Sequence, residues 1–278
     1  MVAKFMPWRL RWFFSKCLSK RFWASYFHVT SETPKISAVS TFIRAFLRPI
    51  DIDARSKDPI ALNLHGGAQI KLTGFTDLFI FTEIFVEKEY DWPDLKLQPK
   101  TIVDIGANIG LFALRMTQRH AQAELFCFEP FPPNFSRLED LVTRNDIQRI
   151  KRWQKGVSST SGHAQLYVHD KNTGGHSIVS ELRVEDSRSV EIELIALKRL
   201  FDLIERPHID ILKLDCEGAE KDIILSLTPD LAERIHAIVF EPSPHIYSTS
   251  LLTDHLNILG YKSETRHGLI FSQRRQAA

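Results

Sequence analysis

Apolar runs alternate regularly with amphipathic segments from Thr101 onward. The runs with the length and composition of buried strands are 101–106, 124–130, 150–157, 208–215 and 236–241. Segments with helical spacing separate the first three runs, one ending at Arg119 and one covering 133–144. Because such alternation is typical of βαβ units, it predicts an α/β fold with a Rossmann-like, doubly wound and mostly parallel sheet.

Shorter runs surround this core. Two alternating stretches, 164–170 and 190–197, flank the polar loop 171–177 and predict an insertion beside the ligand-binding edge. At the C-terminal end, a helix over 251–259 followed by two runs around Tyr261 and 269–271 predicts a closing antiparallel hairpin.

The preceding segment has a different pattern. Runs 60–64 and 69–72, joined by a Gly-Gly turn, predict a β-hairpin, and the spacing of apolar residues predicts a helix over 79–90. We therefore divide the chain into three parts, with loose boundaries in turn-rich stretches. They are a basic and aromatic extension (1–50), a hairpin and helix leading into the core (51–97), and the main α/β domain (98–278).

Charge is distributed unevenly along the chain. Residues 1–31 hold six Lys/Arg and no Asp or Glu, so of the net charge of +2 the remaining residues carry −4. A domain of that sign is a poor match for a protein that must neutralise many phosphates, which argues against a nucleic-acid partner. We expect a smaller acceptor.

The cysteine pattern and the hydropathy constrain the location. Cys17, Cys127 and Cys216 are far apart, without the spacing of a disulfide framework or zinc site, which fits a reducing cytoplasmic setting. No stretch of about 18 uncharged apolar residues is present, so we expect no transmembrane helix and no signal peptide. We expect a cytoplasmic protein, with peripheral contact at the inner membrane surface as an added possibility.

The string Asp104-Ile105-Gly106-Ala107-Asn108-Ile109-Gly110 follows a predicted strand and opens a predicted helix. Glycines there permit a tight turn, and a helix N-terminus offers free N–H groups. The competing interpretation is a dinucleotide fingerprint, because Glu129 lies 19 residues beyond Gly110, near the offset of a ribose-binding acid. Spacing alone does not separate the two interpretations.

Two details favour S-adenosylmethionine over a dinucleotide. Asn108 replaces the glycine that lets a pyrophosphate approach the backbone, and the Asp104 carboxylate would repel that dianion. S-adenosylmethionine has no phosphate, and its ammonium group would be attracted by a carboxylate. A nicotinamide-dependent oxidoreductase and a non-catalytic scaffold that binds lipid or a partner remain the alternatives.

Further site candidates follow the other strands. Glu129 can accept both ribose hydroxyls, and Pro130 then stops the strand. Gly156 and Val157 close the third strand, where small residues would flank an adenine ring, although a simple strand-ending turn explains them equally well.

The fourth strand leads into an acidic cluster of Asp215, Glu217 and Glu220. Clustered acids repel one another, which raises their pKa values and is typical of functional sites. The dipole of a helix beginning here is the structural alternative. We assign function to Asp215 and Glu217 and a structural role to Glu220.

Taken together, these strings resemble the FkbM-type methyltransferase family: DIGANIGLF, FEPFPPNFSRL, LKLDCEGAEKDII and IVFE occur in that order, between about Phe85 and about Glu241. The resemblance implies a class I methyltransferase fold and O-methylation of a natural product or glycan. It places Asp104, Gly106, Asn108 and Gly110 at the methionine end of the cofactor and Glu129 at its ribose. The first 50 residues match nothing in the family.

Methyl transfer requires alignment in a dry site, and an alcohol acceptor benefits from a base. The candidate catalytic residues are His176, Asp215, Glu217 and Glu241, with His245 as a further candidate base. His176 stands out because a glycine pair precedes an imidazole that titrates near neutrality. The spacing of the acids does not require a metal, so we predict none.

Residues 1–30 pair nine aromatic residues with six cations, which is the composition of peripheral membrane anchors. This would suit a lipid-linked acceptor. Packing of the same aromatics onto the catalytic domain is an equally good interpretation. The oligomeric state is not predicted.

Overall fold

The structure is a computed structural model that describes residues 8–31, 35–47, 59–92, 95, 97–169, 175–180 and 188–275. Contacts divide the chain into two compact units, Met1–Lys88 and Glu89–Ala278. The division therefore falls at Lys88, and the segments that we separated at residue 50 belong to one unit.

The first unit begins with three helices, α1 (Trp8–Cys17), α2 (Lys20–Val29) and α3 (Lys35–Leu47). Strands β1 (Ile60–Asn63) and β2 (Gln69–Leu72) then form the predicted antiparallel hairpin. The unit ends with α4 (Phe75–Phe81) and the π-helix η2 (Thr82–Glu87). No helix was predicted for residues 1–50, although Ser19 caps α2 by accepting a hydrogen bond from the N–H of Phe22.

Aromatic side chains fill the core of this unit. The ring of Phe42, on α3, is fully buried and lies within 6.0 Å (centroid to centroid) of rings from both preceding helices: Trp12, Phe13, Phe22, Trp23 and Tyr26. The inner aromatics of α1 and α2 therefore build the hydrophobic core of their own unit.

The predicted helix over 79–90 lies earlier than the apolar spacing suggested. It begins at Phe75, because the Asp77 carboxylate accepts hydrogen bonds from the N–H and the hydroxyl of Thr73 and fixes the entry. It ends at Glu87, where Lys88 adopts a left-handed conformation with φ 60°. Tyr90 therefore lies outside the helix and in the second unit.

The second unit is built on a seven-stranded sheet in the order β11-β12-β10-β9-β3-β4-β5. The strands are β3 (Thr101–Ile105), β4 (Glu124–Phe128), β5 (Ile150–Trp153), β9 (Ile209–Leu214), β10 (Ile235–Phe240), β11 (Tyr261–Arg266) and β12 (Leu269–Arg274). All neighbouring pairs are parallel except those made by β12, which runs antiparallel to both β10 and β11. The mostly parallel sheet and the closing hairpin are confirmed.

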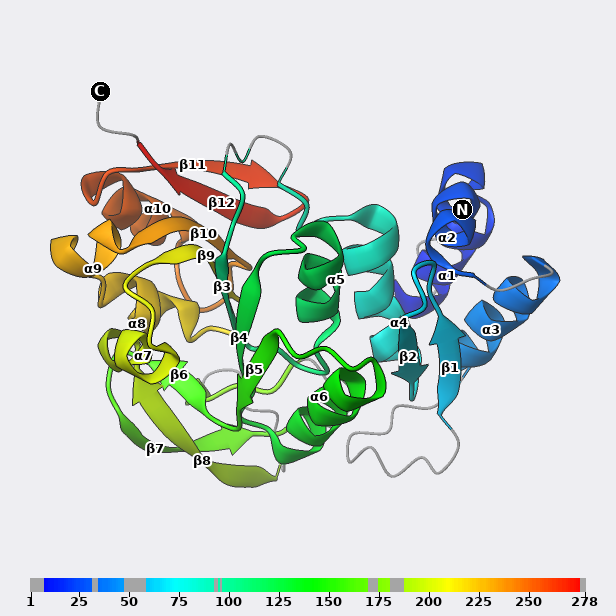
Figure 1. Ribbon diagram of the computed structural model, residues 1–278, viewed down its shortest axis with the longest axis horizontal. Helices are drawn as coiled ribbons and strands as arrows, with labels where there is room; N and C mark the ends of the chain where they lie inside the picture. Colours follow the sequence, from blue (N-terminus) through cyan, green and yellow to red (C-terminus); the bar gives the residue numbers. More distant parts are fainter. Residues whose placement is uncertain are drawn as a thin grey trace. The chain divides into compact units, whose positions relative to one another are not determined.

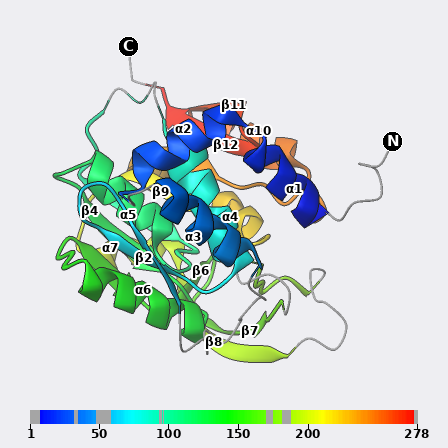
Figure 2. The ribbon, with the colours of Figure 1, turned by 90° about the vertical axis from the view of Figure 1, so that its right-hand side faces the viewer.

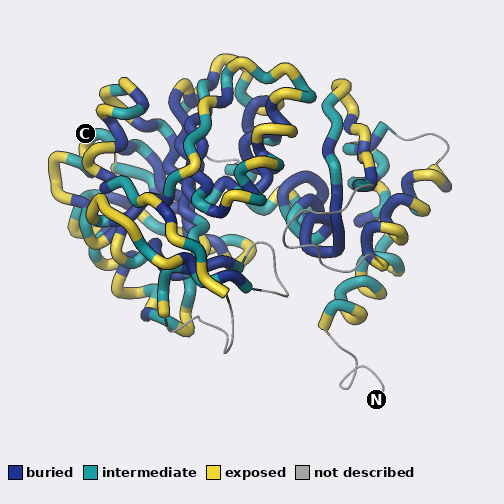
Figure 3. The backbone as a smooth tube through the Cα atoms, turned by 90° about the horizontal axis from the view of Figure 1, so that it is seen from below, coloured by how far each residue is buried: buried dark blue, intermediate teal, exposed yellow. Residues whose placement is uncertain are grey.

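Helices cover both faces of this sheet (Figure 1). On one side lie α5 (Leu111–Arg119) and α6 (Pro132–Arg144). On the other, a continuous apolar cluster joins the sheet to α7 (Leu197–Ile204), α8 (Glu220–Leu225) and α10 (Thr249–Ile258), while α9 (Pro229–Glu233) leads into β10. The strands at the centre of the unit are buried (Figure 3). Among the described residues, no helix is both long enough and apolar enough to cross a membrane.

The stretch 150–157, predicted as one strand, is divided in the structure. After β5 the chain leaves the main sheet, and β6 (Gly156–Ser158) pairs with β8 (Ser189–Ala196), which also pairs with β7 (Gly162–Tyr167). This small sheet lies at the bottom of the views in Figures 1 and 2. The predicted insertion strands are therefore confirmed, and they form a separate sheet with the end of the predicted third strand.

Candidate active site

Four neighbouring strands of the main sheet end at one edge. Backbone hydrogen bonds connect the loops that follow them: the N–H of Gly106 donates to Phe128, that of Asp215 to Ile105 and that of Glu241 to Leu214, over 3.0 to 3.1 Å. The candidate residues after β3, β4, β9 and β10 are thereby held beside one another, at the edge where ligands bind in α/β sheets.

The glycine loop after β3 can be built only with glycine at two positions. Gly106 has φ 75°, and a Cβ there would lie 1.8 Å from the backbone oxygen of Asp215. Gly110 has φ 88° and begins α5, and its Cβ would lie 2.5 Å from a methyl carbon of Leu138. Between them Asn108 is also left-handed, with φ 49°, which asparagine tolerates better than most residues. The loop thus turns sharply against the start of the β9 loop.

Glu129 connects this loop to the end of β4. Its carboxylate is buried, and its two oxygens accept hydrogen bonds from the N–H of Asn108 (2.8 Å) and the N–H of Phe131 (2.9 Å). Burial raises the pKa of Glu129 to about 7, and the two backbone N–H groups oppose that rise. Each oxygen keeps a lone pair, so the carboxylate can still accept a hydrogen bond from a ligand hydroxyl.

Lys213 lies at the centre of the site. Its ammonium group is 3.0 Å from a carboxylate oxygen of Asp104 and 3.4 Å from one of Asp215, and it donates to the carbonyl of Gly106 over 2.8 Å. Burial alone would lower the pKa of Lys213, but the attraction of Asp104 and Asp215 outweighs it and raises that pKa. The lysine is therefore a buried cation that holds the β3 and β9 loops together.

This arrangement changes the expected role of Asp104. Its side chain is fully buried and its partner is Lys213, although we expected it to face the ammonium group of a cofactor. Sequence reasoning missed Lys213, whose signal was a single cation within the apolar run 208–215.

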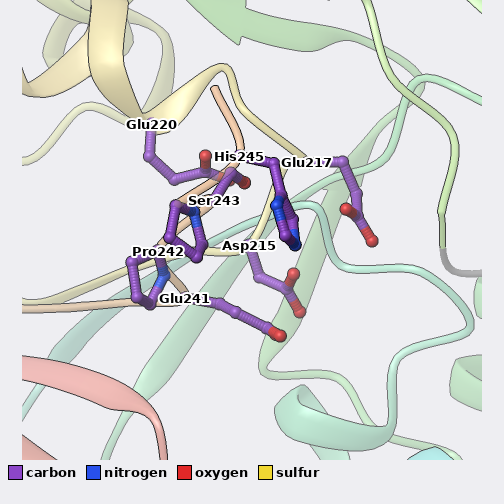
Figure 4. Close-up of a pocket in the computed structure, with 8 residues that line it drawn as sticks. Asp215, Glu217, Glu220, Glu241, Pro242, Ser243 and His245 are labelled. Atoms are coloured by element: carbon purple, nitrogen blue, oxygen red, sulfur yellow. The ribbon is translucent and has the colours of Figure 1, made fainter. Parts of the chain in front are cut away.

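The acidic residues after β9 and β10 line a cavity of about 160 Å³ together with Pro242, Ser243, Pro244 and His245 (Figure 4). Burial, followed by repulsion from Asp215 and Glu241, raises the pKa of Glu217 to about 8. Repulsion from Asp215 is the main reason that the pKa of Glu241 also rises to about 8. Glu241 is more exposed than Glu217, so solvent screens its shift more strongly.

Glu220 has a structural role. Its carboxylate is fully buried and accepts hydrogen bonds from the N–H of Cys216 (2.6 Å) and of Gly218 (2.8 Å), and from the Tyr247 hydroxyl (3.3 Å). It thus fixes the turn that presents Asp215 and Glu217, where Glu217 has φ 51°. Among the described residues, no three His, Cys, Asp or Glu side chains are grouped as a metal site requires.

Tyr90 is a site residue that sequence reasoning assigned to a helix. Its hydroxyl donates to the Asp215 carboxylate over 3.3 Å, and its ring packs on Phe112, at 5.4 Å between centroids. Asp215 is therefore held from two sides, by Tyr90 and by Lys213.

His176 lies near the β4 end of the site. Its ring packs on Phe131, with the centroids 4.2 Å apart, and its Nδ1 accepts a hydrogen bond from the N–H of His169. Burial lowers the pKa of His176 to about 4, so the ring is neutral and carries its proton on Nε2. Within the described part of the chain, Nε2 has no hydrogen-bond partner. The geometry therefore favours a donor role for His176 over the predicted role of base.

The remaining candidates lie around this group. Ser177 donates through its hydroxyl to the carbonyl of Glu217, which connects the His176 segment to the acidic turn. Gly156 approaches Pro130, since a Cβ there would lie 3.7 Å from the proline Cβ. Val157, expected beside an adenine ring, packs in the apolar core. The loop residues 170–174 lie outside the described residues.

The seven-stranded, mostly parallel sheet closed by an antiparallel hairpin is the class I methyltransferase fold predicted from the sequence. The methyltransferase FkbM domain matches residues 104–263, and the chain belongs to that family. The resemblance in the sequence motifs is thereby confirmed.

Two relatives of this chain are named as methyltransferases. The chain is 31% identical over 192 residues to methyltransferase sdnD of Sordaria araneosa and 34% identical over 193 residues to 31-O-demethyl-FK506 methyltransferase FkbM of Streptomyces tacrolimicus. Both matches cover 59% of this chain and 73% of the relative. The crystal structure of methyltransferase FkbM from Methylobacillus flagellatus KT has a TM-score of 0.46 and 14% identity, over 90% of this chain and 62% of that chain.

Proposed function

We propose that this protein transfers a methyl group from S-adenosylmethionine to a hydroxyl group of a small natural product, glycan or glycolipid. The proposal rests on one observation. The N–H of Asn108 donates a hydrogen bond to the Glu129 carboxylate, at the same sheet edge as the acidic cavity. The loop predicted to bind the cofactor and the acid-lined cavity of about 160 Å³ are thus next to each other. The family assignment supports a methyltransferase over the oxidoreductase alternative.

The donor set fits S-adenosylmethionine better than a dinucleotide. Every ionisable side chain that lines the cavity, apart from His245, is a carboxylic acid, and the buried cation Lys213 is already paired with Asp104. The residues that line the cavity offer a pyrophosphate no ammonium or guanidinium group, and the Asp215 carboxylate attracts the sulfonium and ammonium groups of S-adenosylmethionine. Glu129 would hold the ribose, and the Gly106–Gly110 loop would lie against the methionine end. When bound, this cofactor supplies an electrophilic methyl group.

The chain's own residues would manage the acceptor proton. At neutral pH Glu217 holds its proton, because its pKa is about 8, and Asp215 is held by Lys213 and Tyr90. We assign to Asp215, which lines the cavity (Figure 4), the removal of the acceptor's hydroxyl proton by a carboxylate oxygen; Glu241, whose pKa is also about 8, would hold its proton like Glu217. Glu217 would then orient the acceptor as a hydrogen-bond donor.

The acceptor class rests on relatives and on charge. A relative named for methylation at the 31-O position of FK506 supports a hydroxyl on a natural product, and the net negative charge of the second unit disfavours nucleic acid. We further propose a cytoplasmic location, as the cysteine pattern predicts.

The proposal is tested by supplying methyl-labelled S-adenosylmethionine with hydroxyl acceptors of the three classes. Label should appear in a product that resists mild alkali, because a methyl ether survives conditions that hydrolyse a methyl ester. Label only in alkali-labile products would contradict O-methylation of a hydroxyl. Binding of the cofactor without any transfer would favour the scaffold alternative.

A further inference from the structure

The outer face of α1 carries a row of exposed apolar side chains. Leu10, Phe14 and Leu18 are spaced four residues apart, and the N–H of Leu18 donates to the carbonyl of Phe14, which continues the helical turn past Cys17. Residues at this spacing lie on one face of a helix. Their exposed fractions are 37%, 47% and 84%, so the row, which we call the outer row, is open to solvent.

The other face of α1 accounts for the packing of its unit. Trp12 and Phe13 stack on Phe42, and the Arg9 guanidinium lies over the ring of Phe75. Lys16 pairs with Glu87. Because these contacts fix the helix, the outer row is not needed to hold the unit together.

Cations adjoin the outer row in the sequence: Arg11 follows Leu10, and Lys20 and Arg21 begin α2 two and three residues after Leu18. Arg11, Lys20 and Arg21 are exposed, and none forms an ion pair with a residue that the structure describes. No acid occurs in residues 1–31 to neutralise them. The surface therefore combines an apolar row with uncompensated positive charge.

We propose that this surface attaches the protein to the anionic face of a lipid bilayer. The apolar row would enter the boundary between headgroups and acyl chains, and the three cations would lie against anionic headgroups. Nucleic acid would pair with the cations but leave the apolar row in water. An acidic protein partner would not need a linear apolar row. A bilayer accounts for both the apolar row and the cations. Each cation near such a surface strengthens binding roughly fivefold.

The structure reduces the number of residues within 1–30 that can contact lipid. Phe22 and Tyr26 are buried in the unit's own core, so they are not available to lipid, and Phe5 lies outside the described residues. Deletion of residues 1–30 would remove that core, so point variants of the outer row are the sharper test.

The experiment is flotation of the full chain with vesicles of phosphatidylcholine, alone or with about one third phosphatidylserine. The wild type should bind the anionic vesicles, and binding should fall at least tenfold between 0.1 M and 0.5 M salt, because salt screens the cations. The L10S/F14S/L18S variant should bind at least tenfold more weakly. The R11Q/K20Q/R21Q variant should lose its preference for phosphatidylserine.

Ile258→Ser is the matched control, since Ile258 is 82% exposed on α10 of the second unit. It should bind like the wild type, and all variants should keep the circular dichroism spectrum of the wild type, because the replaced side chains are exposed. The proposal is overturned if the wild type ignores anionic vesicles, if L10S/F14S/L18S binds like the wild type, or if RNA displaces the protein from vesicles while binding L10S/F14S/L18S equally well. None of these results depends on S-adenosylmethionine, so they are independent of the proposed function.

Discussion

Lys213 and Asp104 form an ion pair inside the main sheet, with 3.0 Å between the ammonium nitrogen and a carboxylate oxygen and with 4% and 0% of the two side chains exposed. The two residues are paired across β3 and β9, so their side chains share one face of the sheet. Because Lys213 also reaches Gly106 and Asp215, the pair links the cofactor loop to the acidic cavity.

Replacing Lys213 should therefore lower the free energy of unfolding. Lys213→Met leaves Asp104 buried without a cation, and loss of one partner of a buried pair costs about 3–5 kcal/mol of unfolding free energy. Urea denaturation measures the change. The double variant Lys213→Met with Asp104→Asn should recover part of the loss, and a single variant as stable as the wild type would contradict the role of the pair.

The closeness of the two loops is tested at Gly106. Gly106→Ala should cost at least about 3 kcal/mol, because the new Cβ would meet the Asp215 oxygen and the left-handed backbone adds strain. Gly260→Ala is the control: it has φ 90° but nothing within 4 Å, so it should cost only about 1–2 kcal/mol. If thermal or urea denaturation shows the same loss of unfolding free energy for Gly106→Ala and Gly260→Ala, backbone strain alone is responsible for the loss.

Stability should depend on pH through Glu217. Its pKa rises from 4.5 to about 8 on folding, so the folded state holds this proton more tightly than the unfolded state. The stability linked to it is therefore present below about pH 4.5 and is lost as the pH rises toward 8, by of the order of 2–3 kcal/mol. Glu217→Gln should flatten the curve of unfolding free energy between pH 5 and 8. Glu191→Gln, at an exposed position on β8, should not, and an unchanged curve for Glu217→Gln would exclude the shift.

His176 should remain neutral across the working range. Its pKa of about 4 and the hydrogen bond to Nδ1 predict the tautomer with the proton on Nε2. Nitrogen-15 spectra of histidine-labelled protein report tautomer and charge directly, and the signal missing in His176→Gln identifies the residue among the 11 histidines. Titration between pH 6 and 7 would restore His176 as a candidate base.

The sequence predicted the main sheet because each of its strands is marked by local apolar runs and turn residues. It also predicted the acids at the strand ends, because the local pattern shows which residues directly follow a strand. The break between Trp153 and Gly156 was not predictable, because it depends on the fit of Gly156 against Leu194, from a strand much later in the chain.

Two site residues were not predicted from the sequence for the same reason: their role depends on contacts with residues far away in the chain. Lys213 and Tyr90 matter through contacts with Asp104 and Asp215, which only the folded sheet brings close. The helices of the first unit carry mixed apolar and basic patterns, because Arg9 and Lys16 face its aromatic core, and this obscured their periodicity.

Isothermal titration calorimetry of the full chain measures whether the Asn108 loop and Glu129 bind S-adenosylmethionine. If they do, S-adenosylhomocysteine should bind saturably, NAD should give no heat, and Glu129→Gln should bind S-adenosylhomocysteine about 1–3 kcal/mol more weakly, because it loses a charged acceptor. Saturable binding of NAD, with no response to S-adenosylhomocysteine, would contradict it.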